Sequence, residues 1–159
     1  MDFFTADICD NAPSNVKVLP PIFNSYGKKQ KFFGEIETVK LYEDNKALVE
    51  LLRDTQGNGR VCVVDVEGNY CAVVGENLMN FAAKNGWAGI VINGYVRDTL
   101  QTSQIDVGLF AIGIYPFKSQ KKQAGEVGID LNIHNIKVTK GEFLWADVDG
   151  VVITKNQEI

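Results

Sequence analysis

Apolar residues in this 159-residue chain fall into short runs that are separated by polar or glycine-containing turns. Runs of about four to eight residues rich in β-branched side chains are typical of strands, and unbroken runs indicate strands that are buried on both faces. The pattern predicts strands at residues 33–41, 60–66, 70–74, 88–93 and 109–115, and shorter strands at 131–133, 136–138, 143–146 and 151–154. The strand at 33–41 alternates in a way that does not show which of its faces points inward.

Three segments have the spacing of helices. Thr5 is in position to cap a helix that runs to Asn11. A second helix begins at Asp44 or Asn45, and a third is opened by Gly75 and ended at residue 86, where glycine is favoured just past a helix. The inward faces are expected to carry Ala47, Leu48, Leu51 and Leu52 in the second helix and Leu78, Phe81 and Ala82 in the third.

Strands therefore alternate with a few helices, and the chain has no internal repeat or linker. This arrangement predicts an α/β fold with a mixed central sheet. The length fits one domain that covers residues 1–159.

The charge of the chain argues against a nucleic-acid partner. The net charge is −4, whereas binding to phosphates needs clustered lysine and arginine. One basic cluster is present, Lys118 with Lys121 and Lys122, and we interpret it as a solvated loop.

The sequence also favours a cytoplasmic location. The N-terminus has neither the basic region nor the apolar core of a secretion signal, and no apolar stretch is long enough to span a bilayer. The three cysteines, Cys9, Cys62 and Cys71, lack metal-site spacing, and we expect them to be reduced.

Candidate chemistry lies directly after the apolar run at 88–93. A loop is expected over residues 94–98, and a loop that follows a buried strand is where α/β proteins place ligand-binding groups. Arg97 carries a planar guanidinium that can bind a carboxylate with two hydrogen bonds. Asp98 offers hard oxygen ligands for a divalent cation. The pair suggests a site for a small carboxylic acid and a metal ion; the alternative is a surface pair with little effect.

A second candidate is the start of the helix at residues 75–78. The first backbone N–H groups of a helix lack internal partners and attract anions, and Gly75 permits a close approach. The alternative, that Glu76 only stabilises the first helical turn, has about equal weight on sequence alone. One helix and one strand separate this helix start from Arg97, so both loops should meet at the same edge of the sheet.

Other motifs carry less weight. The glycines at 57 and 59 precede a strand rather than follow one, so they indicate a turn and not a dinucleotide site. His134, the single histidine, lies in an alternating strand pattern and is expected to be structural. Zinc sites favour clustered cysteine and histidine, which argues against zinc.

Four stretches spread over nearly the whole chain resemble the family of the regulator of ribonuclease activity A: residues 5–10, 57–65, 85–98 and 146–150. That family includes the class II 4-hydroxy-4-methyl-2-oxoglutarate aldolases. The resemblance implies a swivelling β/β/α fold and a homotrimer with active sites near subunit boundaries.

The resemblance also implies roles for individual residues. The backbone of Gly75, Glu76, Asn77 and Leu78 would hold the carboxylate of the pyruvyl group, Arg97 would contact the substrate, and Asp98 would bind Mg²⁺ or Mn²⁺. Ribonuclease regulators of the family typically lack the metal-binding aspartate, so Asp98 favours an enzyme. Glu76 stands where the enzymes commonly have aspartate, and we expect it to position the water that removes the proton of the 4-hydroxyl group.

The expected activity is cleavage of 4-hydroxy-4-methyl-2-oxoglutarate to two pyruvates through an enolate, with oxaloacetate decarboxylation as a second activity. The alternative is a non-catalytic protein that binds and inhibits a ribonuclease E-type complex. No motif supports a methyltransferase. For the trimer, six aromatic residues are candidate interface residues, although the core is the commoner place for phenylalanine: Phe3, Phe4, Phe32, Phe33, Phe143 and Trp145.

Overall fold

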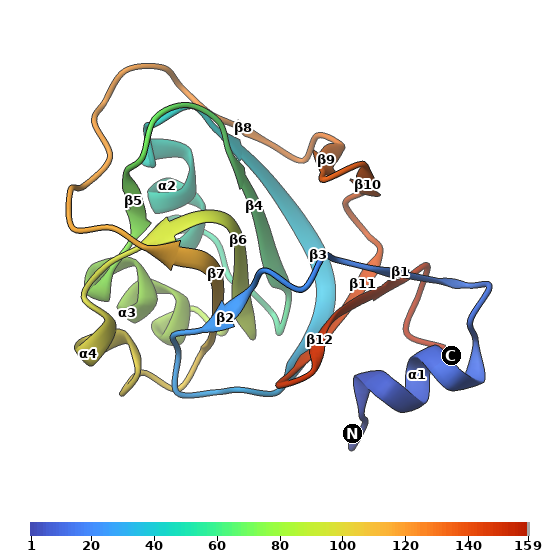
Figure 1. Cartoon of the computed structure of the whole chain (residues 1–159). Coiled ribbons are helices and arrows are strands. Elements are labelled where there is room, and N and C mark those ends of the chain that lie inside the picture. Colours follow the sequence, from blue (N-terminus) through green and yellow to red (C-terminus); the bar gives the residue numbers. More distant parts are fainter. Residues whose placement is uncertain (159) are drawn as a thin grey trace.

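The computed structural model describes residues 1–158 and is built around four parallel strands (Figure 1). Across the sheet these are β3 (Phe32–Leu41), β4 (Val61–Val66), β6 (Gly89–Val96) and β7 (Gly108–Ile114). The sequences of β4, β6 and β7 are apolar almost without a break because parallel strands are usually covered on both faces, whereas β3 also carries polar residues. The longer strands predicted from the sequence therefore form the centre of the fold.

Antiparallel strands extend this sheet on both sides, in the order β1-β12-β11-β3-β4-β6-β7-β2, while β5 pairs with β6 and β8 pairs with β3. The predicted pair β9 and β10 forms a separate two-stranded sheet. The remaining strands are β1 (Val16–Val18), β2 (Asn24–Ser25), β5 (Ala72–Val74), β8 (Glu126–Val127), β9 (Leu131–Ile133), β10 (Ile136–Val138), β11 (Phe143–Asp147) and β12 (Gly150–Thr154). The helices are α1 (Thr5–Asn11), α2 (Lys46–Asp54), α3 (Glu76–Lys84) and α4 (Thr99–Thr102).

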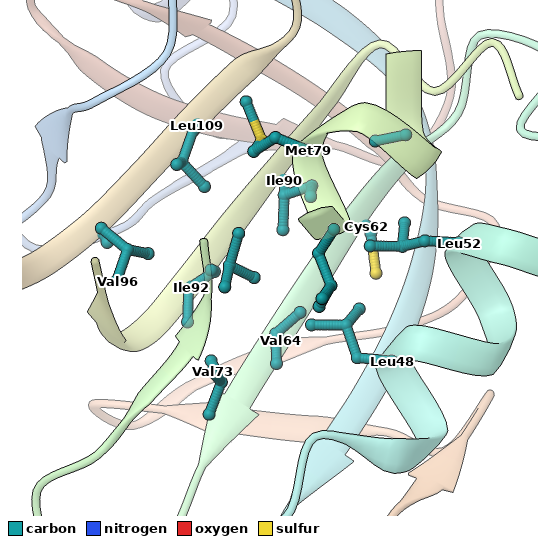
Figure 2. Packing of buried hydrophobic residues seen from close by; sticks show 14 of the residues in the cluster. Leu48, Leu52, Cys62, Val64, Val73, Met79, Ile90, Ile92, Val96 and Leu109 are labelled. Carbon is teal, nitrogen blue, oxygen red and sulfur yellow. The ribbon is translucent and has the colours of Figure 1, made fainter. Parts of the chain in front are cut away.

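Helices α2 and α3 cover one face of the parallel strands. Leu48 and Leu52 of α2 and Met79 of α3 are fully buried against this face (Figure 2). Burying a side chain of this size stabilises the fold by about 2 kcal/mol. The inward faces predicted for both helices are thus confirmed, although Met79 was not anticipated. Cys62 lies in the same cluster, and burial raises the pKa of its thiol, so it is a packing residue.

The other face of the parallel strands is covered by β-structure. Val61, Val63 and Val91 pack against side chains of β9, β11 and β12, chiefly Leu131, Ile133, Leu144 and Ile153. Helix α1 then covers the far side of β11 and β12, where Phe3 and Ile8 pack against Trp145 and Val152. In Figure 1, α1 and both chain ends lie on the side of the molecule away from α2 and α3. The layers are therefore β, β and α, as the resemblance implied.

Two local predictions were wrong. Thr5 does not cap α1: Phe4 precedes the helix, and Thr5 lies inside it, where its N–H and its hydroxyl donate hydrogen bonds to Asp147 at 2.8 and 2.6 Å. His134 is not in a strand; it is exposed in the turn between β9 and β10 with φ of 49°. The position of Thr5 depends on a partner 142 residues away, which the sequence near Thr5 does not reveal. The position of His134 depends on a tight turn that interrupts an alternating pattern.

The aromatic residues proposed for an interface mostly belong to the core of the chain itself. Phe3, Phe32 and Trp145 are buried, and the ring of Phe33 stacks on Trp145 with centroids 5.4 Å apart. Only Phe4 of the six is largely exposed, at 55%. Most of these aromatic residues are therefore core residues, which was the alternative interpretation of the sequence.

Candidate functional site

The site is built where β5 takes over from β4 as the neighbour of β6. Strand β4 pairs with β6 up to Asn93, and β5 then pairs with the end of β6 at Tyr95 and Val96. The predicted strand at 88–93 therefore continues to Val96, and the loop begins at Arg97 rather than at residue 94. The backbone N–H of Arg97 donates to the carbonyl of Val74 at 2.9 Å, so the ends of β5 and β6 lie side by side.

This pairing brings the two predicted loops together. The carboxylate of Asp98 accepts a hydrogen bond from the backbone N–H of Glu76, with 3.0 Å between Oδ2 and N. Gly75 stands directly beside this contact, and a Cβ atom at that position would collide with Oδ2 of Asp98. Gly75 is therefore needed because Asp98 approaches the start of α3 closely.

The start of α3 offers unpaired donors. The first hydrogen bond of the helix runs from the N–H of Met79 to the carbonyl of Gly75, so the N–H groups of Asn77 and Leu78 have no partner within the helix. These donors carry the positive end of the helix dipole and can bind a carboxylate. The side chain of Leu78 is buried in the core, so Leu78 can contribute only its backbone.

A cavity of about 490 Å³ lies over this helix start. Five of the six predicted residues line it, namely Gly75, Asn77, Leu78, Arg97 and Asp98. The side chain of Glu76 is exposed and does not line the cavity, although its backbone N–H holds Asp98. The structure therefore gathers the predicted residues in one place but leaves the carboxylate of Glu76 at its margin.

Lysines that sequence reasoning set aside also line the cavity. Lys118 and Lys121 belong to the segment that follows β7, and both are on the wall of the cavity. Backbone hydrogen bonds hold this segment on β5: Ala72 donates to the carbonyl of Phe117 at 2.7 Å, and Ser119 donates to the carbonyl of Ala72 at 2.9 Å. The interpretation of these lysines as a solvated loop is confirmed, because all three are exposed and lie outside helices and strands, but the sequence analysis did not connect them with the cavity. A signal was present, because the segment follows a predicted buried strand, and loops after parallel strands share one sheet edge.

Arg97 lines the same cavity as the start of α3 and the two lysines. It is partly buried, and its guanidinium donates a hydrogen bond of 3.4 Å to the carbonyl of Pro116. This weak contact leaves most of the five N–H donors of the guanidinium available to a ligand.

The donor set around Asp98 fits a magnesium ion that keeps several waters. Oδ2 is engaged by the N–H of Glu76, while Oδ1 accepts no hydrogen bond from residues 1–158. Within the same residues, no three histidine, cysteine or acidic side chains gather as a metal-binding group. Mg²⁺ is commonly bound through one or two carboxylates and completed by water and substrate, whereas a closed protein cage would need more ligands.

Comparison with known proteins finds relatives that match nearly the whole chain. Residues 5–153 match the model of the RraA-like family, described as Aldolase/RraA. A protein of Aromatoleum aromaticum, provisionally named a 4-hydroxy-4-methyl-2-oxoglutarate aldolase, is 43% identical over 98% of both chains. The fold is similar to that of the RNA-processing inhibitor RraA from Thermus thermophilis, with TM-score 0.92, 36% identity and coverage of 98% of this chain and 94% of that one.

A third relative carries a different name. The structure of a protein from Geobacillus kaustophilus, described as an S-adenosylmethionine:2-dimethylmenaquinone methyltransferase, has TM-score 0.92 and 34% identity, over 98% of this chain and 97% of that one. Relatives that are 34–43% identical to this chain are thus named as an aldolase, an inhibitor and a methyltransferase. No helix among the described residues is long and apolar enough to cross a membrane.

Proposed function

The chain belongs to the Aldolase/RraA family, and from that premise we propose that it is a class II aldolase that cleaves 4-hydroxy-4-methyl-2-oxoglutarate into two pyruvates. The observation that carries the proposal is the position of Asp98, whose carboxylate is held at the start of α3 beside Arg97. An inhibitor that only binds another protein has no need for a metal ligand in a cavity of this kind.

The proposed roles are those implied by the family resemblance, and the geometry of the cavity is compatible with them. The N–H groups of Asn77 and Leu78 bind the carboxylate next to the 2-oxo group. Asp98 would hold Mg²⁺ or Mn²⁺, and a metal bound there would supply Lewis-acid stabilisation of negative charge. Arg97 orients the substrate and stabilises the same charge.

The reaction is a retro-aldol cleavage. Loss of the proton of the 4-hydroxyl group turns C4 into a carbonyl carbon while the bond between C3 and C4 breaks. The electron pair of that bond passes into the enolate of one pyruvate, and protonation at C3 completes the second product. Oxaloacetate can lose CO₂ to reach the same enolate, so we propose decarboxylation as a second activity.

We assign to Glu76 the positioning of the water that accepts the hydroxyl proton. Its carboxylate projects from the first residue of α3, one residue from the N–H groups that bind the substrate. If this is correct, Glu76→Gln lowers kcat and leaves KM nearly unchanged, because the substrate contacts are made by the backbone.

The test is an assay of pyruvate release from a panel of 4-hydroxy-2-oxo acids and oxaloacetate. EDTA should abolish activity and Mg²⁺ or Mn²⁺ should restore it. Asp98→Asn is the sharpest variant, since its amide oxygen can still accept the hydrogen bond from Glu76 while the charge that binds the metal is gone. Full turnover in EDTA, or an active Asp98→Asn, would show that the metal mechanism is wrong.

The second candidate is inhibition of a ribonuclease E-type complex, and it is favoured by the similarity to the RNA-processing inhibitor of Thermus. It is tested by adding the purified protein to such a ribonuclease and following cleavage of a labelled RNA. Inhibition at equimolar protein together with no pyruvate release from any acid would favour this function over the aldolase.

A further inference from the structure

Two lysines at the cavity over α3 have no ion-pair partner among the described residues. Of the three clustered lysines, Lys122 lies 3.4 Å from Glu43, whereas Lys118 and Lys121 have no carboxylate within 4.0 Å in the part of the chain that the structure describes. The two lysines that line the cavity are therefore the two without a partner. In a chain of net charge −4, this is a local reversal of sign.

The backbone that carries these lysines is fixed. Besides the bonds of Ala72 to Phe117 and of Ser119 to Ala72, the N–H of Gln120 donates to the carbonyl of Glu43 at 3.0 Å. The segment is thus attached to β5 on one side and to the turn before α2 on the other. Two lysines on a fixed backbone lose less freedom when they bind an anion than they would on a free loop.

The charged side chains on the wall are Arg97, Lys118 and Lys121 against Asp98. A monocarboxylate uses only the start of α3 and Arg97 and leaves both ammonium groups without an anion. A second carboxylate on the same molecule would supply that anion, and charge-assisted hydrogen bonds of this type are among the stronger ones.

We propose that Lys118 and Lys121 bind the second carboxylate of the substrate, so that this site selects 2-oxo diacids over 2-oxo monoacids. The inference rests on the proposed function for one point, the placement of the first carboxylate at the start of α3. According to this inference, the segment after β7 determines which substrates bind, and the groups around Asp98 carry out the bond cleavage.

The test is direct binding, which needs no turnover. Calorimetry in the presence of Mg²⁺ compares 2-oxoglutarate with 2-oxopentanoate, two five-carbon acids that differ in the second carboxylate and lack the 4-hydroxyl group needed for cleavage. Lys118→Gln and Lys121→Gln remove the charge and keep a polar side chain that is one atom shorter. Each should weaken binding of 2-oxoglutarate about tenfold, equivalent to about 1.4 kcal/mol, and leave binding of 2-oxopentanoate unchanged.

Lys122→Gln is the matched control, because that lysine is paired with Glu43 and does not line this cavity. It should leave both affinities unchanged. Raising the salt concentration should weaken the diacid more than the monoacid in the wild-type protein and abolish that difference in the double variant Lys118→Gln/Lys121→Gln.

The outcomes separate this inference from the proposed function. Lysine-dependent preference for the diacid without pyruvate release would support the subsite and contradict the aldolase. Pyruvate release with unchanged diacid affinity in the double variant would support the aldolase and overturn the subsite. A wild-type protein that binds the two acids equally, or binds neither, would also overturn the subsite.

Discussion

Asp98 has a backbone conformation that is uncommon for a residue with a side chain. Its φ and ψ are 58° and 40°, in the left-handed region, where a residue other than glycine is held at a cost of about 1 kcal/mol or more. Two hydrogen bonds hold it there: its carbonyl accepts from the N–H of Thr102 at 2.8 Å, and its carboxylate accepts from Glu76. The conformation turns the carboxylate back toward α3, and this places it next to Arg97 in the cavity.

Substitutions of Arg97 distinguish the effect of its planar guanidinium from the effect of its positive charge. Arg97→Lys should be nearly as harmful as Arg97→Ala, because lysine keeps the charge but loses the planar fork that binds two oxygens at once. Loss of a contact of this kind in the transition state costs about 3 kcal/mol, or about a hundredfold in rate. Steady-state kinetics of pyruvate release measure the effect, and wild-type kcat/KM in Arg97→Lys would rule out the proposed role.

Gly75 tests the close contact on which the site depends. Gly75→Ala should remove most activity, because the added methyl group collides with Oδ2 of Asp98 and forces the carboxylate away from the start of α3. Gly113→Ala is the control, since its methyl group would meet the edge of the Tyr95 ring at 2.9 Å, a side chain that can move. If Gly75→Ala retains activity equal to that of the control, the contact between Asp98 and α3 has no part in function.

At the scale of elements, α1 depends on one buried carboxylate. Asp147 at the end of β11 is only 5% exposed and accepts hydrogen bonds from the N–H and hydroxyl of Thr5. Burial acts to raise the pKa of Asp147, but the hydrogen bonds from Thr5, Asp149 and Gly150 outweigh it and hold the pKa below its ordinary value. The ionised form therefore stabilises the folded state.

The sign of the pH effect follows. Because the folded pKa is lowered, this stabilisation is complete above the ordinary aspartate pKa of about 3.9 and disappears as the pH falls through the lower folded value. Thr5→Val removes the hydroxyl and keeps the shape, so it should lower the free energy of unfolding at pH 7 by about 1.5–3 kcal/mol. Urea unfolding at pH 7 and at pH 3 measures it, with Thr5→Ser as the control. A difference from wild type that does not shrink at low pH would contradict the assignment.

At the scale of the whole molecule, the family resemblance leads us to expect a homotrimer. The site lies on loops at one edge of the sheet, where a neighbouring subunit could cover it and exclude water. Exposed aromatic side chains are present beside this edge, with Phe117 at 73% and Tyr70 at 65% exposure. Light scattering should give three times the 17.6 kDa mass of the chain. A monomer with full activity at the assay concentration would show that the site is complete within one chain.

Local patterns were sufficient for most of the fold and for part of the site. The strands at the centre and the inward faces of α2 and α3 could be predicted, because burial imposes a regular spacing on apolar residues. Gly75, Arg97 and Asp98 could be proposed because helix starts and the ends of buried strands have known uses, and the family resemblance assigned their roles. The part of the candidate site that the sequence by itself indicated is therefore the helix start at Gly75 together with Arg97 and Asp98.

Only the tertiary structure decided which further groups join them. The pairing of β5 with the end of β6 extends that strand to Val96, and the order of the sheet places Lys118 and Lys121 on the wall of the same cavity as the start of α3. The contact of Thr5 with Asp147 likewise joins residues 142 positions apart. Such contacts leave no periodic trace in a sequence, because they depend on which strands become neighbours, and that choice is made by the packing of the whole chain.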